Sequence, residues 1–357
     1  MDPSPTCPRT AYRLDCRPVK ILVLKPSSLG DVVQSLPVAR LLRQHLPQAQ
    51  IHWWLNRELV PLLEGDPDID AVIPFDRRRW ATPSGWPEAF ATLQRARRER
   101  YDWVIDLQAL ARSAVFGWLT DGSYTIGLED YREGAPLFYD RSVPRPSPHA
   151  HAVDWYLAVL REMGIPVHSN FEWLSVRPDA QTIVDEVWPA EGSRWVALQP
   201  GARWLNKRWP VDSFAELAVG LLRSRPDIRV AVLGGAGDRA LGDEICKRAG
   251  SRALNLAGRL TLPTMVAWVR RCALMVTNDT GPMHVAAALR VPMVAVFGPT
   301  DPAHTGPYGQ LNSVLRLELA CSPCQTPTCH FQEPMACLRR LPVSVVLEAA
   351  CRRLNSN

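Results

Sequence analysis

Long apolar runs are missing from this sequence of 357 residues. No uninterrupted stretch approaches the roughly 18 apolar residues from which a membrane-spanning helix is built. Residues 1–19 contain Pro, Arg, Asp and Cys without an apolar core, so we expect a loose N-terminal extension there rather than a secretory signal. These absences predict a cytoplasmic protein, whose nine cysteines are thiols or metal ligands rather than disulfides.

Motifs for nucleic-acid binding are missing as well. The sequence has no helix-turn-helix, zinc-finger or RNP pattern, so we expect no nucleic-acid partner. The net charge is a mild +5, but arginines gather at residues 77–79 and again at residues 95–100. Such a run is either a solvated helix face or a basic surface that meets an anionic substrate or an anionic membrane.

The order of the predicted elements indicates two α/β domains, which the chain length also favours. Short apolar runs at residues 21–24, 51–55, 71–75 and 103–107 predict buried strands, and the pattern restarts at 195–198, 229–233, 274–277 and 292–297. Helical stretches between them predict two Rossmann-like, doubly wound parallel sheets that face a cleft, in residues 20–180 and 190–340. Residues 341–357 are expected to form a C-terminal helix, which could pack back on the N-terminal domain.

Residues 25–32 directly follow the first predicted strand and open a helix. Gly30 allows a tight turn, and Asp31 lies at or near the helix start. The Asp31 carboxylate either caps the helix or stands at the cleft, where it can take a proton from an acceptor hydroxyl. One glycine does not make the G-x-G-x-x-G fingerprint, whose absence argues against a nicotinamide oxidoreductase.

A loop in the second half is suited to hold a diphosphate. Residues 199–210 run from a strand through a glycine to Lys207 and Arg208, just before a helix. Basic side chains beside a helix start can clamp phosphate groups. The segment could also be an ordinary solvated loop.

A second anion-binding turn is predicted at residues 276–285. After the strand come Asp279, Thr280 and Gly281, and Pro282 is placed for the first helical turn. Free N–H groups at such a helix start face an anion, and His284 either reaches the same anion or is a half-buried polar side chain. Residues 296–302 end the next strand and either shape the nucleotide pocket or form a plain turn.

Four thiols occur close together near the C-terminus, at Cys321, Cys324, Cys329 and Cys337. Such a set could bind zinc or an iron–sulfur cluster. Its spacing fits neither a standard zinc finger nor a ferredoxin, so free thiols stay open as the alternative.

Taken in order, these motifs resemble glycosyltransferase family 9, the lipopolysaccharide heptosyltransferases, from about residue 19 to the C-terminal helix. The resemblance rests on residues 25–32, 105–110, 207–210, 278–284 and 297–301. It implies a GT-B fold, an ADP-heptose donor and inversion at the anomeric carbon, with no cofactor required. Residues 77–80 and 131–139 are more similar to the first heptosyltransferase than to the second. This implies a Kdo-bearing lipid A acceptor, hence a lipid-linked saccharide, and peripheral contact with the cytoplasmic face of the inner membrane.

The resemblance also implies roles for single residues. Asp31 matches the catalytic base, and Lys207 matches the contact to the donor phosphates. The donor-binding turn corresponds to Asp279, Thr280, Gly281 and His284. The basic acceptor contacts correspond to Lys25, Arg78, Arg79, Arg112 and Arg132. The chain departs from the family at Ala109, where glycine is common, and at Pro282, where leucine is common.

Overall fold

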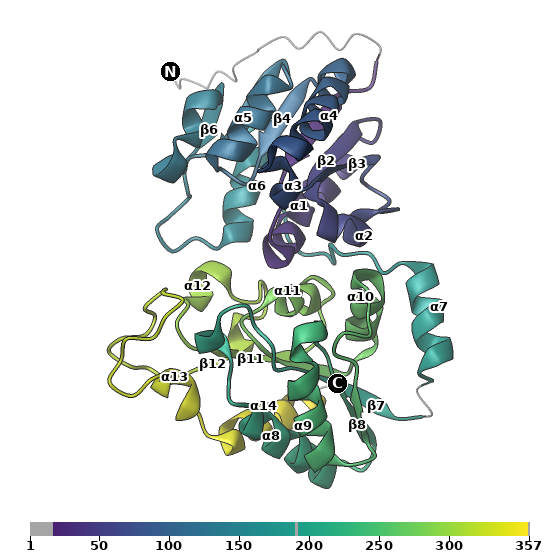
Figure 1. The fold of residues 1–357 in the computed structure, drawn as a ribbon, viewed down its shortest axis with the longest axis vertical. Coiled ribbons are helices and arrows are strands. Elements are labelled where there is room, and N and C mark those ends of the chain that lie inside the picture. The colour runs from purple at the N-terminus through teal and green to yellow at the C-terminus, as the bar shows by residue number, and fades with distance from the viewer. Residues whose placement is uncertain (1–16, 190–191, 356–357) are drawn as a thin grey trace, which may run out of the picture.

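Two parallel sheets of six strands each organise the residues that the computed structural model describes, 17–189 and 192–355. The first sheet has the order β3-β2-β1-β4-β5-β6 and the second the order β12-β11-β10-β7-β8-β9. Counted within its own half, each sheet therefore has the Rossmann order 3-2-1-4-5-6. Figure 1 shows the two units stacked one above the other. The predicted pair of doubly wound parallel sheets is confirmed.

The N-terminal unit alternates strands and helices along most of its length. Its strands are β1 (Lys20–Leu24), β2 (Gln50–Asn56), β3 (Ala71–Phe75), β4 (Trp103–Asp106), β5 (Tyr124–Leu128) and β6 (Arg141–Val143). Its helices are α1 (Leu29–His45), α2 (Val60–Leu63), α3 (Arg77–Trp80), α4 (Trp86–Glu99), α5 (Ala111–Leu119) and α6 (Ala152–Glu162). The short strands β5 and β6 extend the sheet beyond the four strands expected from the sequence.

The C-terminal unit repeats this arrangement. Its strands are β7 (Arg194–Gln199), β8 (Ile228–Val232), β9 (Ala253–Asn255), β10 (Leu274–Asn278), β11 (Met293–Phe297) and β12 (Val314–Arg316). Its helices are α7 (Pro178–Val187), α8 (Val211–Ser224), α9 (Arg239–Ala249), α10 (Leu262–Arg271), α11 (Gly281–Ala288), α12 (Pro302–Thr305), α13 (Ala336–Arg339) and α14 (Val343–Asn355). Within the described residues, no helix is long and apolar enough to cross a membrane.

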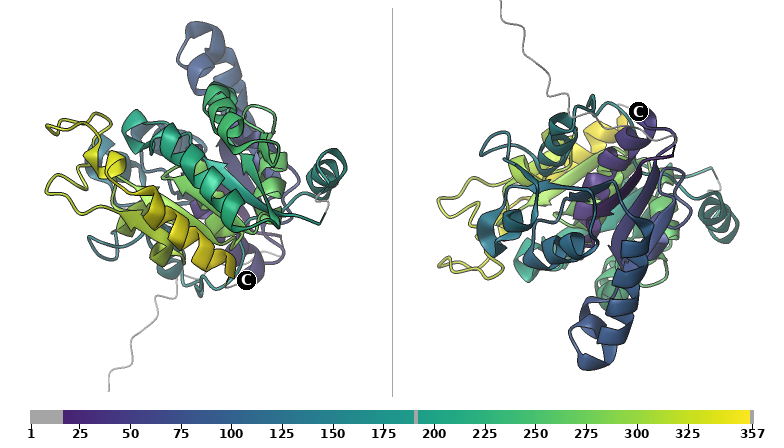
Figure 2. Two further views of the ribbon diagram at one scale, coloured as in Figure 1. Left: turned by 90° about the horizontal axis from the view of Figure 1, so that it is seen from below. Right: turned by 90° about the horizontal axis from the view of Figure 1, so that it is seen from above.

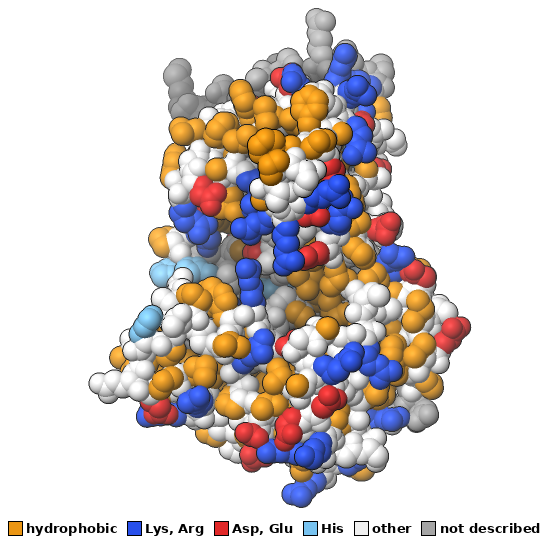
Figure 3. Space-filling view, in the orientation of Figure 1, with side chains coloured by type: hydrophobic (Ala, Val, Ile, Leu, Met, Phe, Trp, Pro, Cys, Tyr) orange, Lys and Arg blue, Asp and Glu red, His pale blue; other side chains and the backbone are white. Residues whose placement is uncertain are grey.

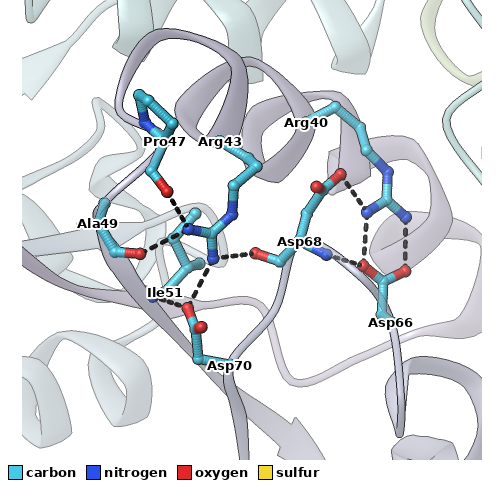
Figure 4. Close-up of polar contacts among 8 residues, drawn as sticks. All are labelled: Arg40, Arg43, Pro47, Ala49, Ile51, Asp66, Asp68 and Asp70. Carbon is cyan, nitrogen blue, oxygen red and sulfur yellow. Dashed lines mark hydrogen bonds and ion pairs between the residues drawn. The ribbon is translucent and has the colours of Figure 1, made fainter.

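The segment between the units is tied to the N-terminal unit by a hydrogen bond from Arg40, whose guanidinium also forms ion pairs within that unit. The Arg40 guanidinium lies 2.5 Å from the Asp66 carboxylate and 2.7 Å from that of Asp68, and its Nε donates to the Trp173 carbonyl. Figure 4 shows the Asp66 and Asp68 carboxylates at the Arg40 guanidinium, together with the neighbouring Arg43–Asp70 pair. Arg40 and Asp66 are both largely buried, and breaking such a pair is costly. The connecting chain is therefore held against the N-terminal unit at Trp173.

The C-terminal helix α14 does not pack back on the N-terminal unit, contrary to expectation. It contacts α8, β10 and β11 of its own unit, and Figure 2 shows it alongside α8. Val346, Ala349 and Ala350 share one helix face and are buried in the core of that unit. The Trp209 indole N–H, which donates to the Leu341 carbonyl, fixes the entry to the helix.

Candidate active site

The N-termini of α1 and α11 meet between the two units, as Figure 1 shows. Two glycines make this close approach sterically possible. A Cβ at Gly30 would come within 2.5 Å of the His284 ring, and a Cβ at Gly281 within 2.9 Å of the Leu29 side chain. Because helix N-termini carry partial positive charge, their meeting point favours anionic groups.

Asp31 belongs to the first turn of α1. Its Oδ2 accepts hydrogen bonds from the Ser28 N–H at 3.0 Å and from the Ser28 hydroxyl at 2.6 Å. Asp31 therefore takes part in capping as the third helical residue of a capping box with Ser28, and the N-cap itself is Ser28. No hydrogen bond to Oδ1 is found among the described residues, so this oxygen is available to a ligand. The carboxylate thus caps the helix with one oxygen and lines a pocket between the units.

Lys25 lies beneath this carboxylate, only 4% exposed. Its Nζ donates to the Leu107 carbonyl at 2.8 Å and lies 4.8 Å from the centre of the Tyr156 ring. The pKa of Lys25 is raised: burial acts to lower it, but Tyr156 and Asp31 outweigh that effect. Lys25 is therefore a buried cation rather than a side chain presented at the surface for an acceptor.

The same positive charge acts on Asp31. Burial alone would raise the pKa of the Asp31 carboxyl. The Lys25 charge and the Ser28 hydrogen bonds outweigh burial and hold that pKa below its ordinary value. Asp31 is consequently ionised at neutral pH and can accept a proton.

Across the pocket, a polar network centres on the buried Asp279. The Lys207 Nζ lies 2.6 Å from Asp279 Oδ2, which also accepts a hydrogen bond from the Thr300 hydroxyl at 2.6 Å. The Lys207 ammonium further lies 4.7 Å from the centre of the Trp204 ring. Asp279 thus holds Lys207 in place at the start of α11, with part of the ammonium facing the pocket.

His284 completes the wall between the two helices. It is 7% exposed, and its Nδ1 has no hydrogen-bond partner among the described residues. Burial lowers the pKa of the imidazole, more strongly than the Asp279 and Asp31 carboxylates raise it. The Nδ1 atom is itself buried, and the neutral His284 side chain lines the pocket.

These groups line the first of two adjoining pockets. The first has a volume of about 460 Å³ and is lined by Asp31, Lys207, Asp279, Thr280, Gly281 and His284 among others. The second has a volume of about 390 Å³ and shares Leu29, Arg203, Thr280 and Pro282 with the first. The catalytic and donor-binding candidates therefore converge on one place, although they come from different units of the chain.

Known proteins are similar to this chain in sequence and in fold. The model of glycosyltransferase family 9 (heptosyltransferase) matches residues 89–334. Lipopolysaccharide heptosyltransferase 1 of Pseudomonas aeruginosa is 30% identical over 335 residues, covering 88% of each chain. The chain belongs to glycosyltransferase family 9. It is therefore a glycosyltransferase, and its two sheets form the GT-B fold.

Relatives of both the first and the second type are similar to this transferase. Lipopolysaccharide heptosyltransferase 2 of Escherichia coli K12 is also 30% identical, covering 84% of this chain and 88% of its own. The structure of E. coli ADP-heptose lps heptosyltransferase II is 26% identical, with a TM-score of 0.76 over 95% of this chain and 99% of that one. Because relatives of both types are 30% identical to this chain, assignment to the first type stays a prediction.

The second pocket contains residues that sequence reasoning missed. After β8, Gly234 and Gly235 turn away from the sheet, and Asp238 accepts the Gly235 N–H at 3.0 Å. The Asp238 carboxylate also lies 3.6 Å from the Arg208 guanidinium and packs against Gly201. The signal was the glycine-rich stretch at residues 234–237, directly after a predicted strand.

The surface arginines expected to contact an acceptor lie outside both pockets. Arg78 and Arg79 are exposed on α3, and Arg79 pairs with Glu88 at 3.0 Å. Arg112 lies over the Phe75 ring, 5.4 Å from its centre. Arg132 is 77% exposed and pairs with Asp130. All four belong to the N-terminal unit, so their role toward an acceptor stays a prediction.

The cysteine cluster gains no support as a metal centre. Within residues 17–189 and 192–355, no three His, Cys, Asp or Glu side chains are placed to hold a metal ion together. Cys321, Cys324, Cys329 and Cys337 are free thiols, and Cys329 Sγ accepts a hydrogen bond from the Met335 N–H.

Ala109, which stands where glycine is common in the family, has a backbone conformation that favours glycine. It has a φ of 53°, in the left-handed region that favours glycine. Its N–H donates to the buried Asp106 carboxylate at 3.1 Å. The turn after β4 therefore keeps a conformation for which glycine is the less strained residue.

Proposed function

We propose that this transferase moves heptose from ADP-heptose to a hydroxyl of the Kdo-bearing, lipid-linked inner core of lipopolysaccharide. Family membership and relatives named lipopolysaccharide heptosyltransferase support the proposal, as does a similar structure titled as an ADP-heptose enzyme. The observation that carries it is the convergence of Asp31 and Lys207 on one pocket from opposite units.

Asp31 is the proposed base. As the acceptor oxygen bonds to the anomeric carbon, its O–H becomes strongly acidic, and the proton passes to the Asp31 carboxylate. The bond from that carbon to the phosphate oxygen breaks on the opposite face, so the configuration inverts and ADP leaves with the electron pair. A carboxylate with a lowered pKa suffices, because the proton moves late, when positive charge has developed at the sugar.

The leaving diphosphate is stabilised by fixed positive groups. The Lys207 ammonium and the N–H groups of Thr280 and Gly281, at the start of α11, are the proposed contacts to its oxygens, since these residues line the pocket. His284 is the additional hydrogen-bonding group, and Asp279 orients Lys207. Because these groups are already in position, charge develops without reorganisation, which is how such sites lower a barrier. The mechanism therefore requires no metal ion.

The two units divide the substrates. The nucleoside occupies the second pocket of the C-terminal unit, against Gly234, Gly235 and Met265. The acceptor approaches from the N-terminal unit, where Arg78, Arg79, Arg112 and Arg132 meet its anionic groups. Lys25 acts from beneath by keeping Asp31 ionised. Since the acceptor is lipid-linked, we place the enzyme in the cytoplasm, peripherally on the inner membrane.

A thermal-shift panel of nucleotides and nucleotide sugars tests the donor assignment. A ligand at about 100 times its Kd stabilises a protein by roughly 2.7 kcal/mol. ADP and ADP-heptose should raise the Tm of the wild type, and Lys207→Ala should lose most of that shift. Stabilisation only by uridine or guanosine diphosphates would discard ADP-heptose as the donor. No response to any nucleotide would contradict the donor site itself.

A further inference from the structure

An apolar pocket of about 840 Å³ opens on the N-terminal unit, outside the active site described above. Its floor is a cluster of aromatic rings, in which Trp54 stacks on Phe116 with ring centres 4.5 Å apart. Phe75 and Trp80 extend this floor, and Leu93 of α4 adds to the wall. A pocket of this size can take a sizeable ligand, and its lining offers little to satisfy the hydroxyls of a free sugar.

Exposed aromatic side chains occur on the helices that line the pocket. Phe90 of α4 lines the pocket and is 63% exposed, and Trp86, one turn earlier on the same helix face, is 61% exposed. Trp118 of α5 is 59% exposed and packs edge-on against Phe138. Figure 3 shows hydrophobic side chains gathered on the upper unit. Exposed aromatic side chains beside an apolar pocket commonly mark an interaction site.

Arginines border the apolar surface. Arg77 and Arg112 line the pocket itself, and Arg78 follows on the exposed turn α3. None of the three makes an ion pair with another described residue. Burial lowers the pKa of Arg112, and the nearby Arg77 charge lowers it further. In Figure 3, Lys and Arg side chains lie below the apolar patch, toward the junction of the two units. The border is thus suited to anionic groups.

We propose that this face, built from α3, α4 and α5, docks the enzyme on a membrane that contains anionic phospholipid, with one acyl chain entering the pocket. The exposed aromatic side chains of α4 and α5 take the position between head groups and chains that Trp and Phe favour. Arg77, which is not among the arginines assigned to the acceptor, meets the lipid phosphates at the pocket border. The inference rests on the proposed function in one respect, since it assigns the surface that brings the enzyme to a lipid-linked acceptor.

The combination of features favours a lipid over other partners. A soluble anion would use the arginines but leave the aromatic surface exposed to water. A protein helix would need a long groove, whereas the pocket is concave and floored by rings. An anionic lipid satisfies the basic border and the apolar pocket together.

Co-sedimentation with vesicles tests the surface. The wild type should bind vesicles that mix phosphatidylcholine with phosphatidylglycerol. It should bind vesicles of phosphatidylcholine alone much more weakly. Phe90→Asp should weaken binding about tenfold or more, because an apolar contact is replaced by a charge. Ile183→Asp is the matched control, since Ile183 is 45% exposed on α7 of the other unit. Equal loss in both variants, or none in Phe90→Asp, would overturn the proposal.

Two further variants separate the components. Ala89→Trp fills the pocket while keeping the surface apolar, and should reduce vesicle binding; unchanged binding would mean that no chain enters. Arg77→Glu should weaken vesicle binding roughly tenfold at low salt. Arg223→Glu on α8, the control, should weaken binding only as far as the change in net charge does. ADP-induced melting shifts, measured on every variant, stay at the wild-type value if only membrane docking is affected. Loss of docking is thereby distinguished from failure of the donor site.

Discussion

Gly30 and His284 touch across the boundary between the two units, although 254 positions separate them in the sequence. Only a residue without a side chain fits at Gly30, because a Cβ would come within 2.5 Å of the imidazole Cδ2. The neighbouring Asp31 and the first turn of α11 are thereby brought to the same pocket. The contact between these helices thus assembles the proposed site.

Gly30→Ala should impair transfer and lower stability. The added methyl must displace His284, and such overpacking typically costs about 1–3 kcal/mol. We expect the transfer rate to fall at least roughly tenfold, with a modest drop in Tm. Gly237→Ala is the control, because a Cβ there meets nothing within 4 Å. A normal rate in Gly30→Ala would show that the two helix starts need not approach so closely.

Lys25→Met should change the pH dependence of catalysis. Lys25 lowers the pKa of Asp31, so loss of its charge should raise that pKa. Transfer needs ionised Asp31, and the acid limb of the rate profile should therefore move to higher pH. Lys20→Met, which removes a surface ion pair with Glu99, should leave the profile in place. An unmoved acid limb in Lys25→Met would exclude Lys25 as the group that keeps Asp31 ionised.

Stability should fall in mild acid because of His151. Burial lowers the pKa of its imidazole to about 4, whereas the unfolded chain has the ordinary value of about 6.5. The unfolded state therefore binds the extra proton first, and stability is lost as pH falls from about 6.5 to about 4. The full effect is on the order of 3 kcal/mol.

Urea unfolding at several pH values checks this effect. The His151 Nε2–H donates to the Gly306 carbonyl of the other unit, while Nδ1 accepts the Val153 N–H at the start of α6. His151→Asn can keep the second bond but has no group to titrate. Its stability should depend less on pH than that of the wild type, and an identical dependence would rule out His151 as the cause.

Most of the proposed site could be predicted from the sequence, because the carboxyl ends of the strands in a parallel sheet lie at the same edge of that sheet. Asp31 and the segment from Asp279 to His284 follow central strands, so their meeting was predictable once two such sheets were recognised. The position of Lys25 was not, because a lysine directly after a buried strand can point either outward or inward. Here the Leu107 carbonyl and the Tyr156 ring hold it inside.

Other features depended on contacts that no local pattern reveals. The edge strands β6, β9 and β12 have three residues each, too few for an apolar run to stand out. The direction of α14 is decided by burial of Val346 and Ala350 against its own unit. The apolar pocket combines Trp54, Phe75 and Phe116, which the sequence distributes over three separate elements.

Heptose transfer by Asp31→Asn tests the central claim most directly. The rate would be measured with saturating ADP-heptose and a Kdo-bearing acceptor, and the donor Kd would be determined on the same preparation. With Asp31 as the base, the rate should fall by about 10²–10⁴-fold while the donor Kd stays at the wild-type value. A transfer rate near that of the wild type would contradict the assignment of Asp31 and the mechanism built on it.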